Sequence, residues 1–208
     1  QRDKNRALWE EKAKNDPDAL EADVVRAIIG DRELHKSQRV VLSSLRAGNS
    51  VLAVMATGRG KSLTFQVHAA CEALAHHTAS LFVYPLRALI ADQAFHINEA
   101  LAPFGINACT LTGESTPDER RQTFAGLADG SVDIVLTTPE FLVCHAPEFA
   151  EAGRIGFVVV DEAHHIGLSR AGHRPAYAQL GGVIEKLGNP VVLALTATSD
   201  EAITNDID

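Results

Sequence analysis

The chain has 208 residues, of which 46% are apolar and 22% are charged, a composition that is ordinary for a globular protein and excludes a disordered or fibrous one. This length fits one domain with an appendage, because a domain has about 150 residues. The net charge is -8, so overall charge cannot attract the protein to nucleic acid, and any such binding must be local. The apolar runs are too short to span a membrane and the N-terminus is charged, so we expect a cytoplasmic protein without a membrane partner.

The cysteine pattern predicts free thiols. Cys71, Cys109 and Cys144 are odd in number, far apart and without a C-x-x-C pair, which favours buried thiols in a reducing compartment over a disulfide framework or a zinc site. The nine histidines include no H-x-x-x-H spacing that would support zinc. The chain begins without an initiator Met and ends soon after a strand-like run, so we expect one lobe of a longer protein.

Residues 1–30 are predicted to form an accessory helical segment. Asp16 can cap a helix, Pro17 can occupy its first turn, and Gly30 can end it. The apolar positions of this helix recur at helical spacing: Leu20, Val24, Ala27 and Ile28. Trp9 lies in the charged part of the segment, and we expect it to anchor the segment to the rest of the protein instead of stacking on a base.

From residue 31 onward, strand-like and helix-like runs alternate, which indicates an α/β fold with a mostly parallel sheet and crossover helices. Several predicted strands are continuous apolar runs, as strands covered on both faces are. The six candidates are 51–54, 81–84, 108–111, 132–137, 157–160 and 191–195. The run Thr116-Pro117-Asp118-Glu119 predicts a helix start with a capping box. Ligands of such folds bind at the carboxyl ends of the strands, and we therefore look there for chemistry.

A glycine-rich loop follows the first predicted strand and opens a helix. It reads Met55-Ala56-Thr57-Gly58-Arg59-Gly60-Lys61-Ser62. The loop amides and the helix N-terminus can bind phosphate oxygens, while Lys61 reaches the β and γ phosphates and Ser62 offers a hydroxyl to Mg²⁺. We predict a P-loop whose nucleotide-binding residues are Thr57, Gly58, Arg59, Gly60, Lys61 and Ser62. The strict P-loop pattern lacks its first glycine, which is Met55 here, and the alternative is an ordinary strand-to-helix turn.

Two carboxylates end another apolar run. Asp161 and Glu162 follow the run 157–160 and begin the sequence Asp-Glu-Ala-His. A carboxylate at the end of a buried strand beside a P-loop can hold Mg²⁺, and the next one can orient or deprotonate the attacking water. We therefore assign Asp161 to the metal, together with Ser62, and Glu162 to the activation of water. The alternative is a pair of solvated acids at a strand end.

With these motifs, the chain resembles the first RecA-like lobe of a superfamily 2 helicase with the DEAH form of motif II, and within that superfamily it is most similar to the RecQ family. The loop 55–62 is similar to RecQ motif I, residues 85–93 to motif Ia and residues 195–198 to motif III. The resemblance covers about residues 30–200 and makes 31–208 a RecA-like ATP-binding domain. A DEAD-box RNA helicase would show Ser-Ala-Thr in motif III and Pro-Thr-Arg-Glu-Leu in motif Ia, and neither stands here.

The resemblance implies roles around the nucleotide. Gln38 lies 23 residues before Lys61, where the family has a glutamine that reads adenine. A side-chain amide suits this role, because it can donate and accept a hydrogen bond at once. Thr196 and Thr198 are implied to bond near the Asp-Glu pair and to link the nucleotide state to a second RecA-like lobe of the same polypeptide. The implied cofactors are ATP and Mg²⁺, and the implied catalytic residues are Glu162, Asp161 and Lys61.

The resemblance also implies contacts with single-stranded DNA after successive strands. The implied residues are Pro85, Arg87, Gln93, Thr112, Thr138, Arg170 and Arg174. Backbone N–H groups and helix N-termini can supply such contacts without net positive charge. The RecQ loop that senses single-stranded DNA corresponds to 166–177, which lacks the family's Trp and Phe. Since one stacked base contributes about 1 to 3 kcal/mol, this loss should weaken DNA sensing or transfer it to Arg170, His173 and Arg174.

We thus expect the ATP-binding and hydrolysing lobe of a RecQ-like DNA helicase. One alternative is a superfamily 2 translocase that moves on duplex DNA or RNA without unwinding it. The other is a nucleotide-gated clamp whose hydrolysis is vestigial. For a superfamily 2 motor, the resemblance implies that a second lobe supplies arginines to the transferring phosphate. Because an arginine finger contributes about 10³ to 10⁵ in rate, the lobe alone should bind ATP and Mg²⁺ but turn over little ATP.

Overall fold

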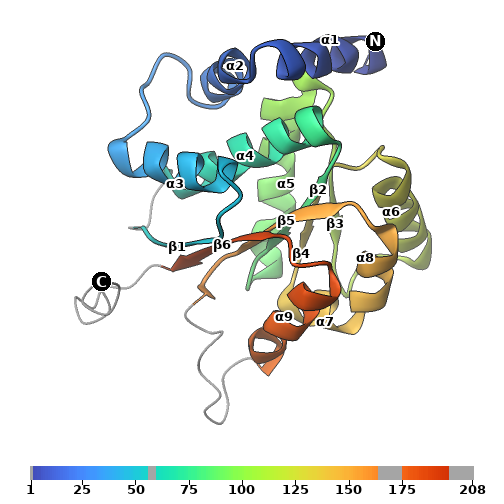
Figure 1. The fold of residues 1–208 in the computed structure, drawn as a ribbon. Coiled ribbons are helices and arrows are strands. Elements are labelled where there is room, and N and C mark those ends of the chain that lie inside the picture. Colours follow the sequence, from blue (N-terminus) through green and yellow to red (C-terminus); the bar gives the residue numbers. More distant parts are fainter. Residues whose placement is uncertain (1, 56–59, 164–174, 197–208) are drawn as a thin grey trace.

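The computed structural model describes residues 2–55, 60–163 and 175–196, and it has an α/β fold in which helices cover both faces of a central sheet (Figure 1). Every pair of neighbouring strands is parallel, and the strand order is β1-β6-β5-β2-β4-β3. The strands are β1 Val51–Val54, β2 Ala79–Val83, β3 Ala108–Leu111, β4 Ile134–Thr137, β5 Ile155–Val160 and β6 Val191–Thr196. All six predicted strands are confirmed, with ends that differ by up to two residues.

The helices within the described ranges follow the predicted alternation with strands. They are α1 Arg2–Asn15, α2 Pro17–Ile29, α3 Lys36–Arg46, α4 Gly60–His76, α5 Arg87–Leu101, η1 Ala102–Phe104, α6 Pro117–Asp129, α7 Pro139–Cys144, α8 Ala146–Ala152 and α9 Pro175–Lys186. Both predicted helix starts are confirmed. The Asp16 carboxylate accepts from the Ala19 amide at 3.0 Å, and Thr116 and Glu119 form a reciprocal capping box.

The two faces of the sheet are packed by two separate apolar clusters. Side chains of α1 to α5 and η1 fill one cluster, and side chains of α6 to α9 fill the other. Strand β2 contributes to both, because Leu81 and Val83 point to the second cluster while Phe82 and the following Tyr84 point to the first. All four are at most 5% exposed, as expected for a strand covered on both faces.

Helices α1 and α2 form an outer layer over α4 (Figure 1). Leu20 and Val24 of α2 are almost fully buried in the same cluster as the α4 side chains. Trp9 of α1 packs against Phe104 with ring centroids 4.7 Å apart, and its indole N–H donates to the Pro103 carbonyl at 3.1 Å. The predicted anchoring of Trp9 is therefore confirmed, whereas a domain boundary at residue 30 stays a prediction.

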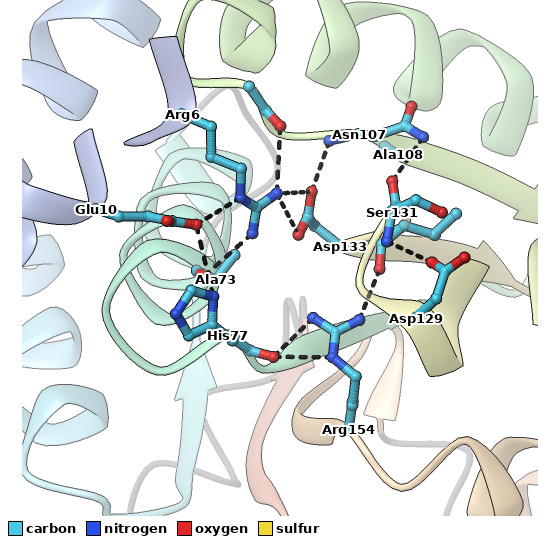
Figure 2. Close-up of polar contacts among 12 residues, drawn as sticks. Arg6, Glu10, Ala73, His77, Asn107, Ala108, Asp129, Ser131, Asp133 and Arg154 are labelled. Atoms are coloured by element: carbon cyan, nitrogen blue, oxygen red, sulfur yellow. Dashed lines mark hydrogen bonds and ion pairs between the residues drawn. The ribbon is translucent and has the colours of Figure 1, made fainter. Parts of the chain in front are cut away.

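A polar network joins α1 to the amino-terminal edge of the sheet (Figure 2). The Arg6 guanidinium donates to both carboxylate oxygens of Asp133 at 2.9 Å, and the Asn107 amide donates to Asp133 at 3.0 Å. Arg154 donates to the carbonyls of His77 and Leu127 at 2.7 Å. Because Asp133 is fully buried, this pairing satisfies a charge that would otherwise be strongly unfavourable there.

The thiol prediction needs one correction. All three cysteines are free, as predicted, but the side chain of Cys144 at the end of α7 is exposed, and Cys71 and Cys109 are only partly buried. Cys144 lies on a short helix that borders an open cavity, and its position could not be inferred from the spacing of the cysteines.

In the ranges described, no helix is long and apolar enough to cross a membrane.

Candidate nucleotide and nucleic-acid site

The predicted catalytic residues lie at the carboxyl edge of the sheet. Lys61 and Ser62 are in the first turn of α4, which follows β1, and Asp161 and Glu162 directly follow β5. Thr196 ends β6, which lies between β1 and β5 in the sheet. Parallel strands end at the same edge, so residues that are about 100 or more positions apart in the chain meet there.

Lys61 and Asp161 are the centre of this site. The Lys61 ammonium lies 3.8 Å from a carboxylate oxygen of Asp161, and the two side chains are 13% and 20% exposed. They line a cavity of about 120 Å³. Its other lining residues are Ser62, Phe65, Tyr84, Leu89, Gln93 and Leu195. The structure thus places a cation, a carboxylate and a hydroxyl beside one small cavity.

The backbone after β5 is held in an unusual conformation. Glu162 has a φ of 55°, in the left-handed region that non-glycine residues rarely adopt. Two hydrogen bonds fix this turn: the Asp161 amide donates to the Val83 carbonyl at 3.0 Å, and the Glu162 amide donates to the Asp161 carboxylate at 3.0 Å. Such strain costs about 1 to 3 kcal/mol and persists where the surroundings impose it, most often at functional sites.

Gln38 lies on the other side of the α4 N-terminus. Its side chain is 4% exposed, its Nε2 donates to the Gly60 carbonyl at 3.0 Å, and its Oε1 accepts from the His35 amide at 2.8 Å. A cavity of about 170 Å³ adjoins it. Gln38 therefore joins the start of α3 to the P-loop, and one N–H and one oxygen lone pair of its amide stay available for a base.

Gly60 is needed for this contact. A Cβ atom at Gly60 would lie 2.9 Å from Nε2 of Gln38, closer than real Cβ contacts. The glycine therefore allows the close approach of the amide to the loop carbonyl. The sequence motif identifies Gly60 as a loop residue, but its role toward Gln38 depends on a contact across 22 residues.

Four of the residues expected to contact DNA line two different cavities. Pro85, Arg87 and Thr138 line an open cavity of about 520 Å³ together with Gly113, Arg120, Glu140, Phe141, Cys144, His145 and Leu86. Arg87 is paired with Glu114 at 2.8 Å. The structure places Gln93 in the small cavity beside Lys61 instead.

The two threonines expected to contact DNA accept hydrogen bonds from backbone amides through their hydroxyls. The Thr138 hydroxyl accepts from the Phe141 amide at 3.2 Å as the cap of α7, and Thr138 is only 5% exposed. The Thr112 hydroxyl accepts from the Glu114 amide at 3.2 Å. Both side chains shape the turns that border the open cavity. Thr57, Gly58, Arg59, Thr198, Arg170 and Arg174 lie outside the described residues.

Tyr84 was missed by the sequence analysis. It directly follows β2, is 5% exposed and lines the cavity of Lys61 and Asp161. Its hydroxyl has no hydrogen-bond partner among the described residues. Burial and the Asp161 charge raise the pKa of Tyr84, so the phenol stays protonated. The position of Tyr84 at the end of a predicted strand could have identified it as a candidate. The direction of its side chain depends on packing against α4, which the sequence pattern does not give.

The donor set fits a magnesium ion that is shared with a phosphate. Asp161 offers a carboxylate and Ser62 a hydroxyl, both at the same cavity, and Mg²⁺ prefers oxygen ligands. Within the described parts of the chain, no group of three or more His, Cys, Asp or Glu residues could hold a metal by itself. This agrees with Mg²⁺, which usually binds through one or two carboxylates plus substrate phosphates.

A lysine and serine at a helix N-terminus after one strand, facing an aspartate at the end of a second, define an α/β nucleotide-binding lobe of the P-loop class. Residues 35–206 match the family described as DEAD/DEAH box helicase, so the chain belongs to the DEAD/DEAH box helicase family. The predicted family resemblance and the RecA-like fold class are therefore confirmed.

The comparisons also identify relatives. The ATP-dependent DNA helicase RecQ of Pasteurella multocida is 35% identical over 195 residues, which are 89% of this chain and 28% of that protein. The RecQ helicase of Haemophilus influenzae is 33% identical over 88% of this chain and 29% of its own length. The structure of Mycobacterium smegmatis helicase Lhr bound to ssDNA and AMP-PNP matches with a TM-score of 0.64 and 26% identity, over 79% of this chain and 23% of that one. The chain thus spans less than a third of these relatives.

Proposed function

We propose that this lobe binds ATP with Mg²⁺ and hydrolyses it to drive movement on DNA and its unwinding, as part of a RecQ-like DNA helicase. The observation that carries the proposal is the meeting of Lys61 and Asp161, 3.8 Å apart at the carboxyl edge of the sheet. This ion pair keeps two charges in place that a phosphate and its metal would each engage. The RecQ relatives support the same function.

The chain's own groups divide the work. Lys61 and the amides at the start of α4 bind phosphate oxygens, because the ammonium and the helix N-terminus both favour negative charge. Ser62 and Asp161 would hold Mg²⁺, and the bound ion would neutralise negative charge on the phosphates. Glu162 orients the attacking water and accepts its proton. The hydrogen bond from its own amide to Asp161 keeps Glu162 beside the metal ligand. Gln38 reads the base with the two hydrogen-bonding positions left on its amide.

DNA is proposed to bind along the open cavity at the turns after β2, β3 and β4. Pro85, Gly113 and Thr138 represent these three turns in its lining. The chain has a net charge of -8, so backbone amides and single cations must supply the contacts. Arg120 and Arg87 both line this cavity. The guanidinium carbon of Arg120 lies 5.3 Å from the centroid of the Phe141 ring, and Arg87 is paired with Glu114.

A second RecA-like lobe of the same polypeptide is proposed to complete the site. An arginine supplied to the transferring phosphate typically contributes about 10³ to 10⁵ in rate. The 208-residue chain should therefore bind ATP and Mg²⁺ but release phosphate slowly, and single-stranded DNA should hardly stimulate it. The expected cytoplasmic location also stays a prediction.

The proposal is tested in the longer parent protein with Glu162→Gln. An amide still accepts a hydrogen bond but cannot take a proton, so ATP affinity should persist while DNA-stimulated phosphate release falls by about 10² to 10⁴. Strand displacement should be lost with it. Turnover at the parental rate in Glu162→Gln would assign the base elsewhere. Phosphate release without strand displacement by the unmodified parent would instead indicate a translocase, and no DNA-stimulated release would indicate a clamp.

A further inference from the structure

The cavity beside Lys61 is also lined by Tyr84, which the proposed function has not used. The Tyr84 hydroxyl has no partner among the described residues, although Tyr84 is only 5% exposed. A buried hydroxyl without a partner is unfavourable and needs a physical explanation. Four residues earlier on the same strand, Ser80 carries another buried hydroxyl without a partner, but it does not line this cavity.

The surroundings of Tyr84 are chemically distinctive. The same cavity is lined by Lys61, Ser62 and Asp161, the three groups assigned to phosphate and metal. Gln93 lines it as well, so polar groups converge on a volume of about 120 Å³, which is large enough for a phosphate group or a few waters. The base end of the site is a separate cavity beside Gln38, and Tyr84 does not line that one.

We propose that the Tyr84 hydroxyl is a positioning group for the terminal phosphate of the bound nucleotide. It donates its hydrogen bond to an oxygen of the γ-phosphate, which supplies the acceptor that the described residues do not provide. This inference rests on the proposed function, because it requires Lys61 and Asp161 to bind phosphate and metal. It adds a protein donor from the residue after β2 to the groups supplied by α4 and by the residues that follow β5.

The location of Tyr84 gives this contact a specific consequence. A donor at the γ-phosphate end distinguishes ATP from ADP, because ADP lacks the oxygen that the hydroxyl would contact. A hydrogen bond to a charged acceptor is strong enough to change affinity by about ten- to a hundredfold. Tyr84 is therefore expected to contribute to the binding of ATP and to contribute little to the binding of ADP.

The test uses the 208-residue chain, Tyr84→Phe, the control Ser80→Ala and Lys61→Ala. Each is titrated with a fluorescent non-hydrolysable ATP analogue and with fluorescent ADP, both with Mg²⁺, and each is melted without nucleotide. Tyr84→Phe should bind the ATP analogue about ten- to a hundredfold more weakly and ADP as the unmodified chain does. Its melting temperature without nucleotide should be unchanged or higher, because an unpaired buried hydroxyl has been removed. Ser80→Ala should bind both nucleotides normally.

The outcomes separate the two proposals. If Lys61→Ala keeps full affinity for the ATP analogue, the nucleotide site itself is misplaced and the proposed function fails. If Lys61→Ala loses affinity while Tyr84→Phe binds the ATP analogue normally, the site stands and the role of Tyr84 is overturned. Equal weakening of ATP analogue and ADP, or a lower melting temperature of Tyr84→Phe without nucleotide, also overturns it, because the hydroxyl would then serve the fold.

Discussion

The two edges of the sheet differ in how their charged groups are used. At the amino-terminal edge, Asp133 accepts hydrogen bonds from Arg6 and Asn107, and Arg154 binds two carbonyls (Figure 2). At the carboxyl edge, Lys61 and Asp161 lie 3.8 Å apart beside a small cavity, which is also lined by Tyr84, whose hydroxyl has no partner among the described residues. The comparison teaches that one edge stabilises the lobe, whereas the other keeps hydrogen-bonding capacity for a ligand.

The amino-terminal edge should be the more sensitive one to a loss of charge. Asp133→Ala leaves the Arg6 guanidinium with Glu10 as its carboxylate partner and removes the acceptor of the Asn107 backbone amide, so the free energy of unfolding should fall by about 3 kcal/mol. Urea denaturation measures this change. Asp118→Ala is the control, because Asp118 forms an exposed ion pair with Arg121 and should contribute at most about 1 kcal/mol. An effect of Asp133→Ala no larger than that of the control would refute the stabilising role of this edge.

Acid should lower the free energy of unfolding through a buried histidine of α4. His68 of α4 is 6% exposed and packs edge-on against Phe157, and burial lowers its pKa to about 4 from 6.5. Because the folded pKa is below the unfolded one, this contribution is complete above pH 6.5 and is lost as the pH falls toward 4. The expected loss is about 3 kcal/mol.

The variant His68→Gln isolates this effect. Glu21, Glu72 and His68 line one cavity, and burial raises the pKa values of the two glutamates. Protonation of these glutamates therefore partly offsets the loss of stability near pH 4. Urea denaturation of the unmodified chain and of His68→Gln from pH 7 to pH 4 subtracts these shared contributions. The difference between the two proteins should shrink as the pH falls. A difference that is constant with pH would mean that His68 does not titrate in this range.

The smallest expected effect concerns the contact between Gln38 and the loop. In Gly60→Ala the new Cβ displaces the flexible end of Gln38, so one hydrogen bond is lost and stability falls by about 1 kcal/mol. Preference for ATP over other nucleoside triphosphates should fall as well. Competition titrations with CTP and GTP measure the preference. If the preference for ATP is unchanged, recognition of adenine does not depend on the placement of Gln38.

The sequence predicts the parts of this molecule that depend on local patterns. Short strand-like runs, several of them continuously apolar, predict the six strands, and the run that begins at Thr116 predicts the start of α6. The P-loop and the Asp-Glu pair could be placed at one edge because parallel strands end together. These predictions needed only residue type, spacing and the geometry of a parallel sheet.

Contacts between distant residues could not be predicted in this way. Arg6 and Asp133 are 127 positions apart, and nothing near either residue indicates the other. The Tyr84 hydroxyl, which has no partner in the described ranges, and the backbone conformation of Glu162 depend on how β2 and β5 pack side by side. The exposure of Cys144 likewise depends on the cavity beside α7.

The central claim is that the carboxyl edge of the sheet binds a nucleoside triphosphate through Lys61. Titration of Lys61→Ala with a fluorescent ATP analogue and Mg²⁺ tests it most directly, with Lys4→Ala of the exposed face of α1 as the matched control. Loss of the ammonium removes a charge-assisted contact to the phosphates, so affinity should fall by at least about a hundredfold while Lys4→Ala binds normally. Unchanged affinity of Lys61→Ala would contradict the assignment of this edge as the nucleotide site.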